Sequence, residues 1–184
     1  IVTDGEQGKS GFFTYVIERF NGFERKPPAP GKEMRPRSAG REYLAFPDYY
    51  AWSERIAAPF GGRSGRGRDV DICTGPVSYK GQAVVQTDIA NLKAAIKGRA
   101  VEDVFVPAIA SSYVASTFAN EHYRTIEEYE QAVSDALREE YQAIVDAGFI
   151  LQIDDPRLVT YYMIHPELSV EDCRKWAKKR VEAI

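Results

Sequence analysis

The chain has 184 residues, of which 44% are hydrophobic and 28% are charged, enough apolar material for one substantial core. Its 24 basic and 27 acidic side chains leave a formal net charge of −3, which predicts nothing about a polyanionic partner, and no nucleic-acid partner is expected. No apolar run approaches the roughly 20 residues that cross a bilayer, and Cys73 and Cys173 lack the close spacing of a disulfide framework or zinc cluster. We expect a cytoplasmic, membrane-free protein with a single domain over residues 1–184.

The N-terminal segment predicts a strand, a turn and a helix. Residues 1–3 are typical of the end of a strand, and residues 4–11 form a polar, glycine-rich turn. Helical spacing of apolar residues follows, at Phe13, Val16, Ile17 and Phe20. Gly22 lies near the expected end of this helix. Because the turn lacks the spacing of a phosphate loop, we interpret it as a strand-to-helix connection that carries acids of a site.

Prolines and basic residues interrupt any periodicity over residues 23–46, which predicts a long loop excursion. Residues 47–56 then predict a helix with Pro47 in its first turn. Residues 61–68 are glycine-rich and basic. That stretch could steer an anionic substrate, but no aromatic residues interleave its arginines, so a solvated loop is the favoured interpretation.

Two further strands are expected in the middle of the chain. Residues 70–73 predict a short strand that ends at Thr74-Gly75-Pro76, and residues 104–108 predict another, followed by a hydroxylated loop over residues 111–113. A helix between them is indicated by the spacing of Ile89, Leu92, Ala95 and Ile96, and Gly98 closes it.

The most informative stretch joins a long helix to a short strand. Thr125 and Glu128 form a capping box, and an apolar stripe continues from there to Gly148, a natural helix stop. The apolar run 149–154 predicts a buried strand with Asp154 at its C-terminal tip. Ligands of parallel α/β proteins bind at that end of the strands, so Asp154 is the first candidate site residue.

Pro156 prevents that strand from continuing. A last helix is capped at Ser169, and its inward side chains are expected to be Cys173, Trp176, Ala177 and Val181. The pattern of strand and helix therefore repeats four times, with strands near 1–3, 70–73, 104–108 and 149–154 lying side by side and parallel. The fold class is α/β, either part of an elaborated (β/α)8 TIM barrel or an open doubly wound sheet.

Four short motifs, in this order, resemble the catalytic barrel of cobalamin-independent methionine synthase and its single-domain relatives, which include epoxyalkane–coenzyme M transferase-like proteins. The motifs are Asp4-Gly5-Glu6, Asn21-Gly22-Phe23, Thr74-Gly75-Pro76-Val77 and Gln152-Ile153-Asp154-Asp155-Pro156. They span essentially the whole chain. The resemblance implies a (β/α)8 TIM barrel of which units two to five are present here, and a methyltransferase of methionine biosynthesis that alkylates a thiol at a zinc ion.

The resemblance also implies roles for individual residues. Glu6 and Asp154 match the acids that hold the amino group of homocysteine, and two carboxylates at neighbouring strand tips are a suitable clamp for an ammonium group. Asp155 stands where methionine synthases carry Glu, and is a second substrate-binding candidate. Tyr79 and Lys80 lie where the synthases place a tryptophan that stacks on the pterin, so folate binding is less well supported. Without the resemblance, Asp154 and Asp155 could equally cap the next turn.

The zinc ligands of the family, a His-x-Cys pair and a later Cys, belong to strands after the fifth unit, beyond Ile184. The candidates within this sequence show no ligand spacing; they are Cys73, Cys173, His122 and His165. Zinc is therefore implied as a cofactor whose ligands lie outside these residues, and the segment alone is expected to be inactive. A partial barrel would expose strand edges, so self-association or association with the missing barrel segments is expected.

The favoured function of the parent protein is zinc-dependent methyl or alkyl transfer to a small thiol such as homocysteine, with the thiol and a methyl or alkyl donor as partners. Two alternatives remain open. One is a uroporphyrinogen decarboxylase-like barrel enzyme that acts on an anionic tetrapyrrole without a metal. The other is a non-catalytic half-barrel that only binds or assembles.

Overall fold

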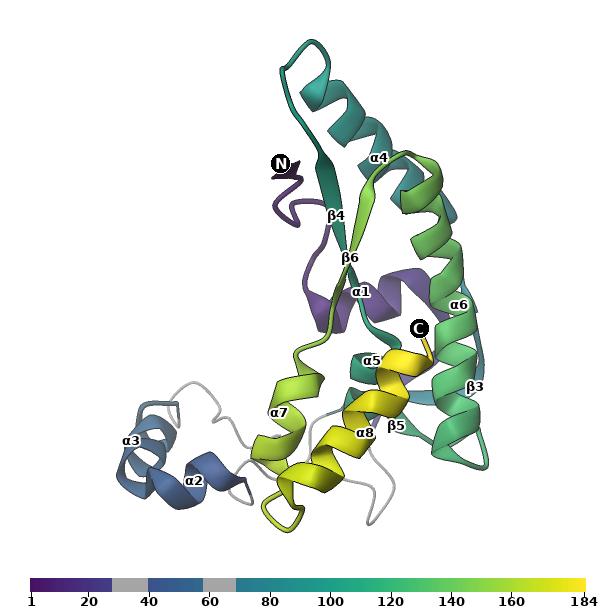
Figure 1. Cartoon of the computed structure of the whole chain (residues 1–184). Coiled ribbons are helices and arrows are strands. Elements are labelled where there is room, and N and C mark those ends of the chain that lie inside the picture. The colour runs from purple at the N-terminus through teal and green to yellow at the C-terminus, as the bar shows by residue number, and fades with distance from the viewer. Residues whose placement is uncertain (28–39, 58–68) are drawn as a thin grey trace. The chain divides into compact units, whose positions relative to one another are not determined.

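The computed structural model describes residues 1–27, 40–57 and 69–184 (Figure 1). The elements, in chain order, are β1 (Val2–Thr3), α1 (Phe12–Arg19), β2 (Phe20–Lys26), α2 (Arg41–Ala45), α3 (Pro47–Ala57), β3 (Val70–Tyr79), α4 (Gln82–Ile96), β4 (Val104–Ile109), α5 (Ser111–Thr117), β5 (Ala119–Asn120), α6 (Ile126–Asp146), β6 (Ile150–Asp154), α7 (Arg157–Ile164) and α8 (Val170–Glu182). In the described part of the chain, no helix is long and apolar enough to cross a membrane.

The chain divides into two compact units. Unit 1 comprises Ile1–Glu24, Asp71–Asp155 and Ala183–Ile184, and unit 2 comprises Arg25–Val70 and Pro156–Glu182. The candidate site lies in unit 1. The expectation of a single domain over residues 1–184 stays a prediction.

The first sheet of unit 1 has the strand order β1-β4-β6, and all its strands are parallel. Val2 is paired with Val104, and the long register between β4 and β6 runs from Phe105 beside Ile150 to Ile109 beside Asp154. The predicted strands at 1–3, 104–108 and 149–154 are therefore confirmed as parallel neighbours. The C-terminal ends of β4 and β6 meet at Ile109 and Asp154, which fixes where a site at this sheet edge must lie.

The fourth predicted strand does not join that sheet, and this expectation was wrong. Residues 70–73 belong to β3, which continues through Pro76 to Tyr79 and forms a second sheet of order β2-β3-β5. Gly22 makes this possible: it has φ +94°, and a Cβ there would lie 2.7 Å from the carbonyl oxygen of Pro76. Because only glycine leaves room for that close backbone approach, Pro76 is accommodated within the strand. The described residues thus form a mixed α/β fold with two small sheets, without a closed barrel.

Packing also overrides the helix expected to reach Phe20. Helix α1 ends at Arg19 and Phe20 opens β2, where its buried ring packs edge-on against Tyr79 with ring centroids 5.6 Å apart. Residues 23–46 were expected to be a loop, but β2 and α2 occupy the two ends of this stretch, and residues 28–39 lie outside the described residues. Residues 61–68, expected as a basic loop, lie outside the described residues. Residues 111–113, expected as a loop, begin helix α5.

Helix α6 is built as the sequence predicts. The Thr125 hydroxyl accepts a hydrogen bond from Glu128 N at 3.1 Å, and the Glu128 carboxylate accepts one from Thr125 N. At the other end Gly148 has φ +84°, and its N–H donates to Val145 O at 2.9 Å. Between these caps the helix contributes Leu137 to one apolar core cluster and Ile144 to a second, which joins the two clusters of unit 1.

In unit 2, Arg41 fastens α2 to the segment that contains α7 and the turn after it. Its guanidinium donates to the carbonyl oxygens of Tyr162 at 2.9 Å and Leu168 at 2.5 Å, and lies 4.0 Å from the Tyr162 ring centroid. Helix α3 follows the prediction for residues 47–56, whereas α7 was not predicted.

The inward face expected for α8 is confirmed in part. Cys173 is buried, and Trp176 and Ala177 are half-buried. The ring of Trp176 stacks on Tyr161 of α7, with centroids 3.8 Å apart. Val181, in contrast, is 58% exposed, so its expected inward position was wrong.

Candidate functional site

The loop between β1 and α1 brings the first acid of the site to the sheet edge. The Asp4 carboxylate accepts a hydrogen bond from Glu6 N at 3.0 Å, and Lys9 N donates to Glu6 O at 3.0 Å. Gly5 and Glu6 both take the left-handed backbone conformation, with φ of +64° and +60°. For a residue with a side chain, this conformation is uncommon, and such positions concentrate at functional sites. The loop therefore holds Glu6 in one direction at a cost in local strain.

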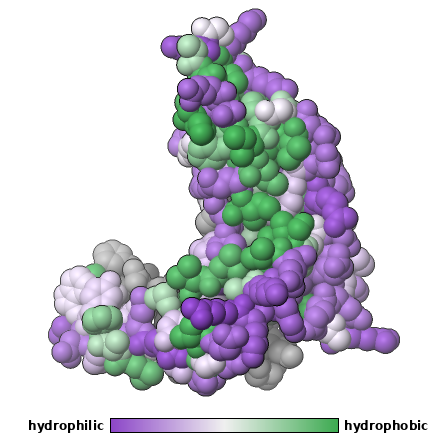
Figure 2. All heavy atoms as spheres, in the orientation of Figure 1, coloured by the Kyte–Doolittle hydropathy of each residue, from purple (hydrophilic) through white to green (hydrophobic). Residues whose placement is uncertain are grey.

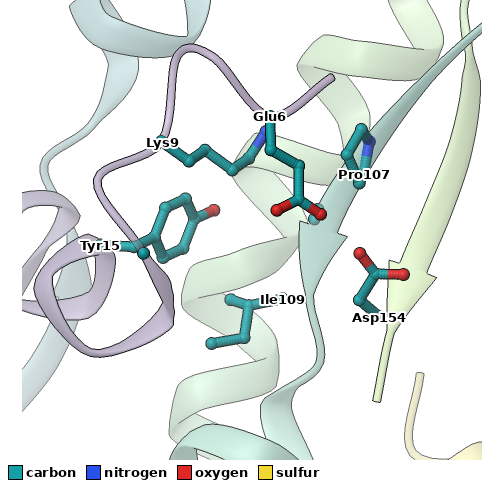
Figure 3. Close-up of a pocket in the computed structure, with 8 residues that line it drawn as sticks. Glu6, Lys9, Tyr15, Pro107, Ile109 and Asp154 are labelled. Carbon is teal, nitrogen blue, oxygen red and sulfur yellow. The ribbon is translucent and has the colours of Figure 1, made fainter. Parts of the chain in front are cut away.

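Glu6 and Asp154 line one small pocket. Its lining residues are Glu6, Lys9, Gly11, Tyr15, Pro107, Ala108, Ile109 and Asp154. Figure 3 shows the two carboxylates facing the same space at the end of β4. The space open to the centre of a water molecule is about 10 Å³, which corresponds to about one water or one ammonium group. The expectation that both acids face one cavity at the same end of the parallel sheet is confirmed.

The charges at this pocket are predominantly negative. Lys9 is the basic lining residue, and its ammonium lies 4.0 Å from the Asp4 carboxylate, with the side chain only 8% exposed. The Asp154 carboxylate accepts a hydrogen bond from Gln152 Nε2 at 2.7 Å. Counting Asp4, Glu6 and Asp154 against Lys9 leaves two negative charges that a bound cation would balance. The pocket is thus suited to a small, positively charged group with several N–H donors.

Asp155 occupies a different environment. It is absent from the pocket lining, and its carboxylate accepts a hydrogen bond from the hydroxyl of Ser112, a buried residue in the first turn of α5. Successive residues at a strand end point to opposite sides, so neighbouring aspartates need not share a ligand. The substrate-binding role of Asp155 stays a prediction, and the geometry favours a role in positioning the end of β6.

Tyr15 connects the pocket to a buried polar network that sequence reasoning missed. The Glu140 carboxylate, on α6, accepts hydrogen bonds from the hydroxyls of Tyr15 and Tyr79 and from Arg19 Nη1 at 3.1 Å. Arg19 Nη2 also contacts the Asp88 carboxylate at 2.6 Å. With Glu140 at 1% exposure, an isolated charge would be costly, and the three donors offset that cost.

A sequence signal for this network existed. Glu140 lies at helical spacing from Leu137 and Ile144, on the apolar stripe of the helix, so a charge there needs a buried partner. Burial and the neighbouring Glu140 raise the pKa of both Tyr15 and Tyr79 well above their ordinary value, so both are neutral phenols at physiological pH. Tyr79, the residue considered beside the pterin, is buried with its hydroxyl committed to Glu140.

The residues that the structure describes do not fit a zinc site. They contain no group of three or more His, Cys, Asp or Glu side chains placed to hold a metal ion. Cys73 lies inside β3, not at a strand end as expected, and burial raises the pKa of its thiol to about 11, which disfavours the thiolate that zinc binds. His122 is exposed. His165 directly follows α7, and its Nδ1 lies 3.0 Å from the Glu167 carboxylate.

Comparison with known proteins identifies a related fold. No family model and no curated protein matches the sequence. Among solved structures, the chain is similar to a B12-independent methionine synthase from Shewanella sp. W3-18-1, determined in complex with selenomethionine, with a TM-score of 0.60 and 20% sequence identity. The match covers 100% of this chain and 42% of the synthase chain, so this sequence spans less than half the length of that enzyme. The chain thus has a mixed α/β fold similar to part of a methionine synthase.

Proposed function

We propose that this chain provides the amine-binding part of the substrate site in a methionine synthase-like enzyme that transfers a methyl or alkyl group to a small thiol such as homocysteine. The observation that carries the proposal is the convergence of the Glu6 and Asp154 carboxylates on one pocket the size of an ammonium group. The fold similarity to a methionine synthase supports the same function.

The size of the pocket defines what part of the ligand it would hold. A volume of about 10 Å³ accepts the ammonium group and leaves the carbon chain and the thiol outside. The contribution of this chain is therefore to bind and orient the amino-acid end, so that the thiol is presented to the methyl or alkyl donor.

Zinc is proposed as the metal of the complete enzyme, with ligands supplied by residues other than those described here. No step at the thiol is assigned to this chain's own side chains. The decarboxylase alternative is disfavoured by the charge of the pocket, because an anionic tetrapyrrole would meet a surplus of carboxylates. A protein that only binds the amino acid would use the same pocket, and an assay of methyl transfer by the complete protein distinguishes the two.

Binding measurements on the 184-residue chain test the proposal. Homocysteine, titrated into labelled protein and followed by NMR, is expected to shift resonances of residues 4–11 and 154. Its deaminated analogue, 4-mercaptobutanoate, should bind at least about tenfold more weakly, because each lost charge-assisted hydrogen bond is worth about 1.5–3 kcal/mol.

The same titration on Glu6→Gln and Asp154→Asn variants should show losses of about tenfold each. Asp146→Asn is a matched control, since that exposed acid ends α6, before the start of β6, and does not line the pocket. Equal affinity for the two ligands, or unchanged binding by both site variants, would contradict the proposed function.

A further inference from the structure

The pocket has a third polar wall, contributed by helix α1. Tyr15 lines it although its side chain is only 1% exposed, and Figure 3 shows the hydroxyl end of the ring directed toward the Glu6 carboxylate. This oxygen is the one neutral side-chain hydroxyl among the lining residues. The sequence pattern placed Tyr15 within a helix without indicating any function.

The hydrogen bond to Glu140 determines whether the Tyr15 hydroxyl can act as a donor or as an acceptor toward a ligand. The single phenolic proton is donated to Glu140, so toward any other partner the oxygen can only accept a hydrogen bond. Glu140 is in turn held by Tyr79 and by Arg19, and Arg19 is anchored at its other end by Asp88. A ring packed in this way loses little conformational entropy when it accepts a hydrogen bond from a ligand.

We propose that Tyr15, whose proton is committed to Glu140, is a third acceptor for the ligand's ammonium group, and that three acceptors make the site selective for primary amines. The inference rests on the proposed function for the identity of the ligand. A primary ammonium has three N–H donors, and Glu6, Asp154 and the Tyr15 oxygen supply one acceptor each. An N-methylated ammonium has fewer donors and needs more room than the space for about one water that the pocket offers.

The chain offers a closely matched pair of variants for the test. Tyr15→Phe and Tyr79→Phe each remove one hydroxyl from Glu140 and keep the ring, but only Tyr15 lines the pocket. The ligands are homocysteine and 3-mercaptopropylamine, which retains the amine and lacks the carboxylate, titrated by NMR. We expect Tyr15→Phe to weaken both by about tenfold, as for a hydrogen bond to a charged group, and Tyr79→Phe to change them less than about threefold.

The outcomes separate this inference from the proposed function. Equal effects of the two variants on amine binding would overturn the role of Tyr15 while leaving the function standing. Binding of 3-mercaptopropylamine but not homocysteine, with the expected difference between variants, would support Tyr15 and overturn the amino-acid substrate. If neither compound binds the wild-type chain, both proposals are overturned.

A second measurement does not depend on the folding of any variant. The wild-type chain is titrated with 3-mercaptopropylamine and with its N,N-dimethyl derivative. We expect the primary amine to bind at least about tenfold more tightly, since the tertiary ammonium keeps one N–H donor of three. Equal affinities would overturn the proposed selectivity.

Discussion

At the scale of single residues, two left-handed positions serve different purposes. Glu6 carries a side chain into that conformation, and the hydrogen bonds from its own N–H to Asp4 and from Lys9 N–H to its carbonyl oxygen hold it there. The result is a carboxylate aimed at the pocket. Gly148 takes the same region without a side chain and ends α6, so that β6 starts in the register that brings Asp154 to Ile109. Glu6 therefore carries backbone strain at the site, whereas Gly148 adopts the same conformation without that strain at a position that only redirects the chain.

Replacement of Gly148 isolates the cost of backbone strain. A Cβ at this position would have no heavy atom within 4 Å, so a substitution meets no steric obstacle beyond its own backbone. We expect Gly148→Val to lower the free energy of unfolding by about 1–3 kcal/mol, because a β-branched residue resists φ +84°. Gly148→Asn should cost less, since asparagine tolerates this conformation. Urea denaturation measures both; indistinguishable stabilities for the two variants would contradict the explanation.

At the scale of secondary structure, local signals predicted the elements that have clear ends. The capping box at Thr125, the stop at Gly148 and the apolar run of β6 are all readable within a few residues. The start of β2 at Phe20 and the passage of β3 through Pro76 depend on contacts with distant residues, so a local pattern could not reveal them.

The residues of the candidate site also divide into those with a local sequence signal and those without one. Glu6 and Asp154 could be predicted because each follows a short apolar strand, and the ends of parallel strands meet at one edge. Tyr15 could not, because its role depends on Glu140, 125 positions away along the chain. Glu140 itself gives only a weak sequence signal, as a charged residue on an apolar helix face.

The buried network joins α1, β3 and α6, and predicts how stability depends on alkaline pH. Burial and Glu140 raise the pKa of Tyr79 above the ordinary value of about 10. The neutral phenol therefore contributes its full stabilisation below about pH 10 and loses it as the pH rises further, because the unfolded chain ionises first.

We expect the free energy of unfolding to fall above about pH 10, with each such phenol contributing up to about 1.4 kcal/mol per pH unit. Tyr79→Phe should make that fall less steep by the share of one group, although the variant is less stable than the wild type at pH 7. Urea denaturation of both proteins at pH 8 to 11 provides the measurement. Parallel pH profiles for the two proteins would show that Tyr79 ionises alike in folded and unfolded chains.

At the scale of the whole chain, apolar burial is concentrated in unit 1. Both core clusters consist of residues from that unit, whereas Cys173 is the buried hydrophobic side chain of the described part of unit 2. Large apolar side chains of unit 2 are exposed, among them Leu44, Trp52 and Val159. Figure 2 also shows hydrophobic side chains on the face over β4 and β6 in unit 1. We propose that these surfaces associate with further segments of a complete enzyme or with a second copy of the chain.

Hydrogen exchange of the 184-residue chain tests this uneven distribution of stability. Local opening is easiest where few apolar contacts must be broken, so amides in α3 and α8 are expected to exchange at least about tenfold faster than those in β4 and the central turns of α6. Mass spectrometry of peptic fragments resolves these segments, and α4, which packs in unit 1, serves as an internal reference. Measurements at low and high protein concentration separate folding from association, because protection of α3 or α8 that grows with concentration identifies those helices as a contact surface between copies. Strong protection of α8 that matches α6 and does not change with concentration would mean that unit 2 holds a stable core of its own.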